Sequence, residues 1–189
     1  MVISIICYAH NPRPDHFQIC LAMIDAQTHV QWEAIIIDDA SDPPLQVPDD
    51  PRFHLIRHQE NYGMLNVHLS WGEGIRASSG ELLTCIGSDD YMYPTRLTRV
   101  VEVFVEDTVV DLLHHNAIFV DADGEIVPMG EEAYIERRWW GLWKTRKTRG
   151  VGTRCFVSSG SRAELYDRLV SGVNLLAHPT VVMRRSLIE

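Results

Sequence analysis

Four short apolar runs, each closed by a polar turn, constrain the fold of this chain more than any other feature. They cover residues 2–7, 34–37, 53–56 and 82–86. Each has the length of a strand and is too short for an independent helix. Uninterrupted apolar strands are typical of a sheet that is covered on both faces. Because a segment with helical spacing follows the first, third and fourth of these runs, the pattern predicts an α/β fold with a mainly parallel central sheet and flanking helices.

Apolar residues at helical spacing predict three helices. The first starts at about Asp15, which has the side chain of an N-cap. The second spans residues 64–77 and is weakened by Gly72 and Gly74, which cost about 1 kcal/mol each relative to alanine. The third spans residues 94–106 and opens with proline. The predicted buried residues are, in chain order, Phe17, Cys20, Leu21, Ile24, Leu65, Leu69, Ile75, Leu97, Val100, Val101, Phe104 and Val105.

Beyond residue 107 the alternation of strand and helix ends. Residues 109–113 are expected to form another strand, and Asp-Gly at 123–124 between short apolar runs predicts a hairpin. A last strand is expected around residues 180–183. Residues 184–189 look like the start of a helix, with Ser186 as an N-cap candidate and no second turn, and helices that short are unstable on their own. We therefore expect the chain to be a piece of a longer protein.

The composition excludes several classes of protein. With 46% hydrophobic and 23% charged residues, the chain has the balance of a globular domain. Its net charge of −9 is uneven, because residues 1–130 carry 6 basic and 20 acidic side chains and residues 131–189 carry 11 basic and 6 acidic. The lack of a broad basic surface argues against nucleic-acid binding. The four cysteines show no metal or redox spacing, which favours reduced thiols in a cytoplasmic protein.

Acidic pairs follow two of the predicted strands. Asp38-Asp39 follows the second, and Asp89-Asp90 follows the fourth. Open α/β sheets bind ligands at the carboxyl ends of their strands, and carboxylate oxygens suit Mg²⁺ or Mn²⁺. Taken singly, adjacent acids in a turn are commonly solvated turn formers. Two pairs at one edge would repel unless a cation or hydrogen-bond donors stabilised them, so they predict a metal site for a phosphate-bearing substrate.

A basic and aromatic run at residues 137–149 holds both lysines of the chain and three of its five tryptophans. One interpretation is a contact with an anionic acceptor, a diphosphate or a membrane surface, with Trp139 and Trp140 at the interface or stacked on sugars. The other is a loop whose tryptophans pack on the core while its basic groups remain in water. The sequence alone supports both interpretations.

Four motifs in order resemble the family 2 glycosyltransferases, nucleotide-sugar-dependent enzymes with the GT-A fold. Residues 8–11 are similar to the family's Pro-Thr-Tyr-Asn turn after the first strand. Residues 32–42 resemble its W-E-x-I-I-V-D-D-G-S-x-D segment. Residues 61–81 are similar to its N-x-G … G-I-x-x-A-x-G-E stretch, and residues 88–97 to the end of D-x-D-D-x-x-x-P-x-x-L.

The resemblance extends over nearly the whole chain and implies one GT-A domain, a Rossmann-like sandwich, over residues 1–189. Residues 1–107 would bind the nucleotide-sugar, and residues 108–189 would form an acceptor side that is incomplete at its C-terminus. The implied chemistry is an inverting displacement at the sugar's anomeric carbon. A metal would neutralise the departing diphosphate, and a carboxylate base would deprotonate the acceptor hydroxyl.

The resemblance also implies roles for single residues. Asp39 would hydrogen-bond the nucleotide base, with the turn at residues 8–11 lining the same pocket. Asp89 would bind the divalent cofactor, Mn²⁺ or Mg²⁺, that bridges the donor diphosphate, and Asp90 would support that metal. The implied donor-binding set is Tyr8, Ala9, His10, Asn11, Asp38, Asp39, Asn61, Gly63, Ser88 and Asp89. The acceptor side would include Trp139, Trp140 and His178.

The chain departs from the family pattern at three places. Gly87 stands where the D-x-D motif has its first acid. Ala9 and His10 replace the family's Thr and Tyr, and Trp71-Gly72 replaces Arg-Asn. These departures bear on which nucleotide is bound and on how the metal is held.

The favoured interpretation is a bacterial-type inverting glycosyltransferase for cell-surface polysaccharide or glycoconjugate synthesis. Its partners would be a nucleotide-diphospho-sugar, preferably a UDP-sugar, and a glycan or lipid-linked acceptor. The family's general base lies downstream of the segment that residues 178–185 resemble, so we expect it beyond Glu189. The protein would be cytoplasmic or held at the inner face of the membrane through residues 137–149.

Two alternatives remain open. A non-catalytic relative that binds a nucleotide or a glycan is favoured by Gly87 and the other departures. A nucleotidyltransferase shares a related sheet and metal use, but that class carries a glycine-rich, basic loop after its first strand. Residues 8–14 contain one arginine and no glycine, which makes this the weaker alternative.

Overall fold

The computed structural model describes residues 1–115 and 178–188. Every strand and helix predicted before residue 107 is present. The hairpin expected at residues 123–124 lies outside the described residues. The elements, with η for a 3₁₀ helix, are β1 (Ile3–Ala9), α1 (Pro14–Asp25), β2 (Trp32–Asp38), β3 (Phe53–Arg57), η1 (Met64–Asn66), α2 (Val67–Ala77), β4 (Leu82–Gly87), α3 (Arg96–Glu106), β5 (Leu112–His114), η3 (His178–Thr180), β6 (Val181–Arg184) and η4 (Arg185–Leu187).

The chain divides into two compact units. The first comprises Met1–Leu113 and Val181–Glu189, and it holds the sheet and its helices. The second comprises His114–Thr180. In its described part, the backbone N–H of His115 donates to the carbonyl of Thr180 at 3.2 Å.

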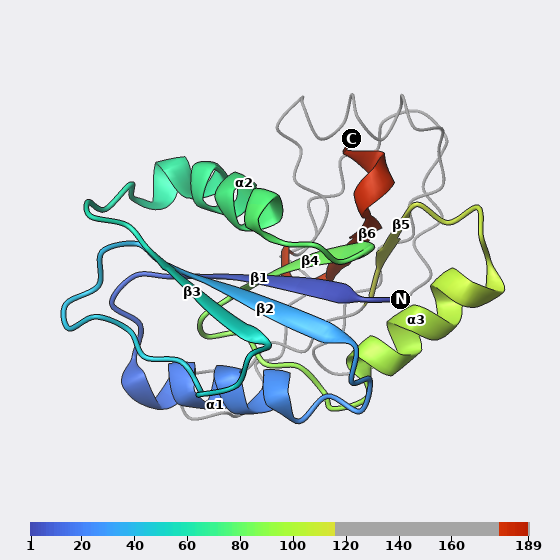
Figure 1. Cartoon of the computed structure of the whole chain (residues 1–189), viewed down its shortest axis with the longest axis horizontal. Coiled ribbons are helices and arrows are strands. Elements are labelled where there is room, and N and C mark those ends of the chain that lie inside the picture. Colours follow the sequence, from blue (N-terminus) through green and yellow to red (C-terminus); the bar gives the residue numbers. More distant parts are fainter. Residues whose placement is uncertain (116–177, 189) are drawn as a thin grey trace, which may run out of the picture. The chain divides into compact units, whose positions relative to one another are not determined.

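The sheet has six strands in the order β3-β2-β1-β4-β6-β5 (Figure 1). The strands β3, β2, β1 and β4 are parallel to one another, and β6 runs antiparallel to β4. The order reverses at β1, whose two neighbours are β2 and β4. At such a point the flanking loops leave in opposite directions, which is where open α/β sheets form their ligand crevice.

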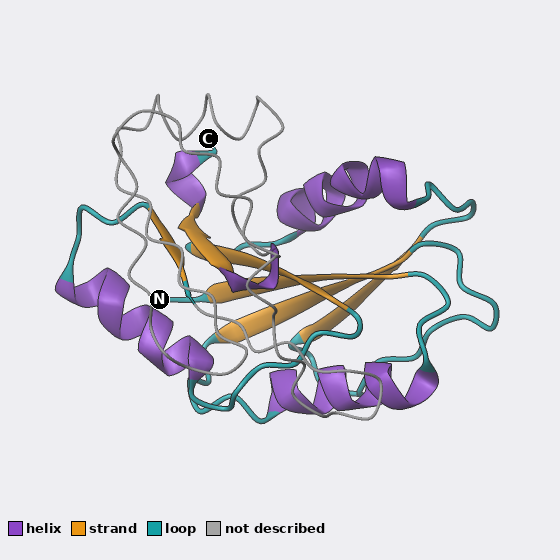
Figure 2. Cartoon of the chain, turned by 180° about the vertical axis from the view of Figure 1, so that it is seen from behind, coloured by secondary structure: helices purple, strands orange, loops and turns teal. Residues whose placement is uncertain are grey.

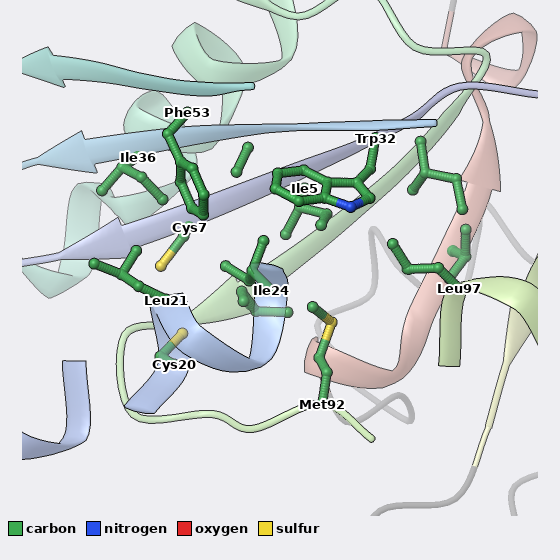
Figure 3. Close-up of a cluster of buried hydrophobic side chains, with 14 of the residues drawn as sticks. Ile5, Cys7, Cys20, Leu21, Ile24, Trp32, Ile36, Phe53, Met92 and Leu97 are labelled. Atoms are coloured by element: carbon green, nitrogen blue, oxygen red, sulfur yellow. The ribbon is translucent and has the colours of Figure 1, made fainter. Parts of the chain in front are cut away.

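Helices cover both faces of the sheet, as the apolar strands predict. Figure 1 and the reverse view in Figure 2 place α2 on one side of the sheet and α1 with α3 on the other. On the α1 side, Ile5 and Cys7 of β1 face Leu21 and Ile24 of the helix (Figure 3). On the α2 side, a smaller core includes Ile6, Ile35, Ile37, Trp71 and Ile75.

The start of α1 differs from the prediction. Arg13 is the N-cap, Pro14 opens the helix, and Asp15 lies in the first turn. Proline suits this position because its missing N–H would lack an intrahelical partner in any case. A carboxylate in the first turn is still favourable because it faces the positive end of the helix dipole.

The predicted buried faces of α2 and α3 are wrong in part. Leu65 is 93% exposed and Leu69 50% exposed, whereas Ser70 and Gly74 are buried. The reason is that η1 interrupts the α-helical phase, because a 3₁₀ turn has 3.0 residues instead of 3.6. In α3, Val105 is 61% exposed, at the edge of the buried stripe.

Gly74 sets how closely α2 approaches the sheet. A Cβ at this position would lie 2.4 Å from Cγ2 of Ile6 and 3.5 Å from Cδ1 of Ile37. At Gly72, two residues away in the same helix, the nearest atom to a Cβ is the flexible guanidinium of Arg76, at 3.3 Å. Only one of the two glycines is therefore required by packing.

The two glycines predict opposite stability effects for the same substitution. Gly74→Ala should destabilise the protein by about 1–3 kcal/mol because it overpacks the contact with Ile6. Gly72→Ala should stabilise it by up to about 1 kcal/mol because alanine is the better helix former. Urea unfolding of the two variants tests this, and equal midpoints would contradict the packing assigned to Gly74.

Candidate functional site

The carboxyl ends of the parallel strands bring the predicted polar residues to one edge of the sheet. Tyr8 of β1 pairs with Gly87 of β4. Ala9 of β1 pairs with Asp38 of β2, and Asp38 pairs with Arg57 of β3. The turns after these strands therefore leave the sheet at the same edge, beside the point where the strand order reverses.

Asp39 follows β2 and accepts hydrogen bonds from four groups. Its side chain is fully buried. Oδ1 accepts from Nδ1 of His58 at 2.7 Å and from the backbone N–H of Tyr62 at 2.9 Å. Oδ2 accepts from the Tyr8 hydroxyl at 2.9 Å and from the backbone N–H of Gly63 at 3.2 Å. Burial alone would raise the pKa of Asp39, but these hydrogen bonds outweigh it and the pKa is lowered, so the carboxylate is ionised.

The hydrogen bond from Asp39 to a nucleotide base stays a prediction. Oδ1 already has two donors, and Oδ2 has three because the Tyr62 N–H is shared between the two oxygens, so a base N–H would have to take the place of one of them. The Tyr8 hydroxyl is the donor best able to leave, because the others are backbone amides and a buried histidine. Burial, followed by the contact with Asp39, raises the pKa of Tyr8 to about 12, so this hydroxyl remains a donor at neutral pH.

Asp38 holds the loop that follows β2. Its side chain is fully buried, and it accepts hydrogen bonds from the backbone N–H of Ser41 at 2.8 Å and of Leu45 at 3.2 Å. The guanidinium of Arg57 donates to the same carboxylate and also to the Ser41 carbonyl at 2.8 Å. These contacts join Asp38 to its own loop and to β3, so any role of Asp38 in donor binding would act through the loop's shape.

The turn after β1 meets the segment after β3. Nδ1 of His10 lies 2.7 Å from the Asp39 carbonyl oxygen, which only accepts, so this nitrogen carries a hydrogen. In the neutral ring, Nε2 then accepts from the side-chain amide of Asn61 at 2.7 Å. Ala9 is buried, whereas Asn11 is exposed and has a φ of 44°. The two contacts of His10 join residues 8–11 to residues 61–63 beside Asp39.

Gly63 occupies a backbone conformation that favours glycine, with a φ of 75°. This conformation lets the chain turn so that the amides of Tyr62 and Gly63 both point at the carboxylate of Asp39. Asn61, Gly63 and Asp39, three members of the donor-binding set that the resemblance implies, therefore lie close together.

The turn after β4 brings two carboxylates together over Gly87. A Cβ at Gly87 would lie 2.9 Å from Oδ1 of Asp89 and 2.9 Å from Oδ2 of Asp90. Oδ2 of Asp90 also accepts the backbone N–H of Gly87 at 2.7 Å. Burial raises the pKa of Asp90, and the negative charge of Asp89 raises it further. Ser88 lies half-buried in the same turn.

These oxygens fit a divalent cation. Among residues 1–115 and 178–188, no group of three or more His, Cys, Asp or Glu side chains is arranged to hold a metal ion, and the turn after β4 offers two carboxylates. Mg²⁺ is commonly held by one or two carboxylates, with water and substrate phosphates completing its shell. A cation beside Asp89 and Asp90 would also offset the repulsion that raises the pKa of Asp90.

Comparison with known proteins identifies the family. The sequence model of glycosyl transferase family 2 matches residues 4–170, which is most of the 189-residue chain. The chain belongs to this family. The resemblance carried by residues 8–11, 32–42, 61–81 and 88–97 is thereby confirmed at the level of the family.

Two relatives of this family 2 chain match a little under two thirds of it. An uncharacterized glycosyltransferase from Nostoc sp. is 30% identical over 124 residues, which are 61% of this chain and 36% of that protein. The O-antigen biosynthesis protein RfbC from Myxococcus xanthus is 25% identical over 127 residues, 65% of this chain and 10% of that protein. The chain thus spans about a third or less of the length of these relatives.

The fold agrees with the family. The crystal structure of residues 1–349 of S. aureus TarS is similar, with a TM-score of 0.52 at 19% identity, and the match covers 68% of this chain and 39% of TarS. At this identity the likeness concerns the fold alone. Together with the mostly parallel six-stranded sheet, it confirms the predicted GT-A, Rossmann-like architecture.

Three predicted acceptor-side residues remain without a described environment. Trp139 and Trp140, with the rest of the run at 137–149, lie outside the described residues. His178 begins η3. Among the described helices, none is long and apolar enough to cross a bilayer.

Sequence reasoning missed His58 and Glu73. His58 directly follows β3, so its place matches that of Asp39 after β2, and polarity at each strand end was the available signal. Glu73 lies on α2 and reaches His58 with Oε2 at 2.8 Å from Nε2. Nothing in the sequence marked Glu73, because its direction depends on the helix phase that η1 resets.

Proposed function

We propose that this chain is the donor-binding portion of an inverting glycosyltransferase. It would move a sugar from a nucleotide-diphospho-sugar to a glycan or lipid-linked acceptor in cell-surface polysaccharide or glycoconjugate synthesis. The observation that carries this proposal is the family match over residues 4–170 on a sheet whose carboxyl edge holds Asp39 and Asp89. A UDP-sugar is the favoured donor, since the similar TarS has been solved with UDP and with UDP-GlcNAc.

In this proposal the turn after β4 holds the metal. Asp89, which is exposed, would bind Mn²⁺ or Mg²⁺ directly, and Asp90, held by the Gly87 amide, would orient and reinforce it. The ion would neutralise charge on the departing diphosphate. Residues 1–107 would form the donor side and residues 108–189 the acceptor side, with Trp139, Trp140 and His178 as candidates for acceptor contacts.

A thermal-shift measurement tests the donor site. Mn²⁺ with UDP should raise the melting temperature of the wild-type chain, because a ligand that binds only the folded state stabilises it by about 2.7 kcal/mol at a hundredfold excess over Kd. Asp89→Ala should abolish the shift, since it removes the exposed metal ligand. Asp49→Ala, at an exposed aspartate outside the site, is the matched control and should keep the shift.

Absence of a shift with any nucleoside diphosphate, in a folded wild-type chain, would refute the donor site. An equal shift in Asp89→Ala would refute the role of this carboxylate alone. The two results are separable because the first concerns the wild type and the second the variant.

Gly87 favours a second candidate, a non-catalytic relative that binds the nucleotide-sugar without turning it over. The carboxylates of Asp89 and Asp90 lie where a side chain at position 87 would begin, the position at which the family's motif has an acid. Such a relative would show the same thermal shift but no sugar transfer when the complete protein is assayed with acceptor. Transfer by the complete protein would exclude it.

A further inference from the structure

His58 lies between two carboxylates at the carboxyl edge of the sheet. Its Nδ1 is 2.7 Å from Oδ1 of Asp39, and its Nε2 is 2.8 Å from Oε2 of Glu73. The His58 side chain is 4% exposed, that of Asp39 is 0% exposed, and that of Glu73 is 38% exposed. The three groups therefore form a chain that runs from the interior to the helix surface.

The geometry requires hydrogens on both ring nitrogens. An ionised carboxylate only accepts hydrogen bonds, so a neutral imidazole, which has one donor and one acceptor nitrogen, satisfies only one of its two partners. The protonated ring satisfies both. In agreement, burial alone would lower the pKa of His58, but its hydrogen bonds to Asp39 and Glu73 outweigh burial and raise it.

The surroundings of His58 favour its positive charge. The Tyr62 ring stacks on the imidazole with centroids 4.2 Å apart and an angle of 28° between the planes. A cation over an aromatic face gains electrostatic stabilisation. The titratable groups that face His58 are Asp39 after β2, Glu73 of α2 and Tyr62 of the following loop, and Tyr8 of β1 reaches it through Asp39.

We infer that His58, clamped by Glu73, is a positioning residue that fixes Asp39 and the Tyr62–Gly63 backbone in the geometry that binds the nucleotide. The inference rests on the proposed nucleotide-sugar site. His58 has no direct access to a ligand, and it acts through Asp39. The backbone amides of Tyr62 and Gly63 donate to the same carboxylate, so loss of the His58 contact would loosen both Asp39 and the 62–63 backbone.

The direction of the pH dependence follows from the raised pKa of His58. A histidine whose pKa is higher in the folded state contributes its full stabilisation below its unfolded pKa, about 6.5. That contribution is lost as the pH rises through the raised folded-state pKa. When the ring loses one proton, Nδ1 retains its hydrogen and still donates to the buried Asp39. Nε2 then presents a lone pair to the carboxylate of Glu73, so the hydrogen bond to Glu73 is lost.

The experiment combines two titrations on the whole chain. NMR of the histidine ring carbons gives the pKa of His58 in the wild type, Glu73→Gln and Glu106→Gln. Calorimetry with UDP and Mg²⁺ from pH 6 to pH 9 gives the affinity of these proteins and of His58→Gln. Glu106 is an exposed glutamate of α3 and provides the matched control. Titration of the nucleotide's own phosphate is common to all four proteins and cancels in the comparison.

We expect His58 in the wild type to titrate above the ordinary histidine value, and UDP affinity to fall about tenfold as the ring deprotonates, the scale of one hydrogen bond to a charged group. Glu73→Gln should lower the pKa of His58 and move the midpoint of the affinity curve to the same lower pH. Glu106→Gln should follow the wild type. His58→Gln should bind about tenfold more weakly at pH 6 and lose the histidine step.

Three outcomes would overturn the inference. The first is a His58 pKa at or below the ordinary value. The second is a Glu73→Gln affinity curve that overlays the wild type although its His58 pKa has fallen. The third is an unchanged pH profile in His58→Gln. The second and third outcomes assume nucleotide binding by the wild type, and a complete absence of binding at every pH would instead refute the proposed function and this role with it.

Discussion

Asp39→Ala should lower the free energy of unfolding by about 3–5 kcal/mol, the cost of removing one partner from a buried ion pair. The alanine would leave the buried His58 cation with only the partly exposed Glu73. It would also leave the amides of Tyr62 and Gly63 without their acceptor. Unpaired buried donors are costly because they lose their hydrogen bonds to water without replacement.

Urea unfolding of Asp39→Ala at pH 6 and at pH 9 separates the loss of the ion pair with His58 from the loss of the hydrogen bonds from the backbone amides. At pH 6 His58 is charged and the loss should be largest. At pH 9 the loss should be smaller because more of the ring is neutral and the wild type has itself lost the ion pair. Asp49→Ala, an exposed aspartate, should change the free energy of unfolding by less than about 0.5 kcal/mol at either pH. A small, pH-independent decrease in the free energy of unfolding of Asp39→Ala would contradict a protonated His58 between Asp39 and Glu73.

The strands and their order along the chain are predictable because both the length of these segments and their apolar side chains favour a buried strand. The runs 34–37 and 82–86 are apolar on both faces, and only a sheet covered on both sides buries such runs. Helix faces were less predictable. The single 3₁₀ turn η1 changed which side of α2 is buried and exposed Leu65 and Leu69. Such a turn depends on how the preceding loop binds Asp39, which is a tertiary contact.

The candidate site, like the fold, was predictable from the sequence only in part. The positions of Asp39 and Asp89 followed from the rule that parallel strands end at one edge, and the structure brings residues 8–11 and 61–63 to the same place. The saturation of Asp39 by protein donors did not follow, because it needs the directions of the Tyr8 and His58 side chains. Gly87 was visible as a missing acid, but only the structure shows both neighbouring carboxylates turned toward it.

Gly80→Ala should destabilise the chain by about 3 kcal/mol, the upper range for overpacking, because the added methyl would meet backbone atoms. A Cβ at Gly80 would lie 2.7 Å from the backbone N of Ser4, 2.9 Å from the carbonyl oxygen of Val2 and 2.5 Å from Oγ of Ser4. The strand β1 cannot withdraw, because it pairs with β2 on one side and with β4 on the other.

The hydrogen bonds of Gly80 add to this cost. Its N–H donates to Oγ of Ser4 at 2.8 Å and to Oε1 of Glu33 at 3.0 Å. Its carbonyl accepts from Nε of Arg185 at 2.7 Å. A shift of the Gly80 backbone to relieve the clash would therefore stretch contacts to β1, β2 and the segment after β6 together.

Chemical denaturation of Gly80→Ala and Gly72→Ala tests whether this crossing is as tight as the structure indicates. Both variants add one methyl group, yet at Gly72 it meets only the flexible Arg76 side chain. The Gly80 variant should unfold at a lower denaturant midpoint. Where it remains folded, its UDP affinity should stay within about twofold, because Gly80 precedes the start of β4 and the proposed donor site lies at the end of that strand. A Gly80→Ala midpoint equal to that of the wild type would mean that a methyl group fits between β1 and the loop before β4. In that case glycine would not be required at position 80.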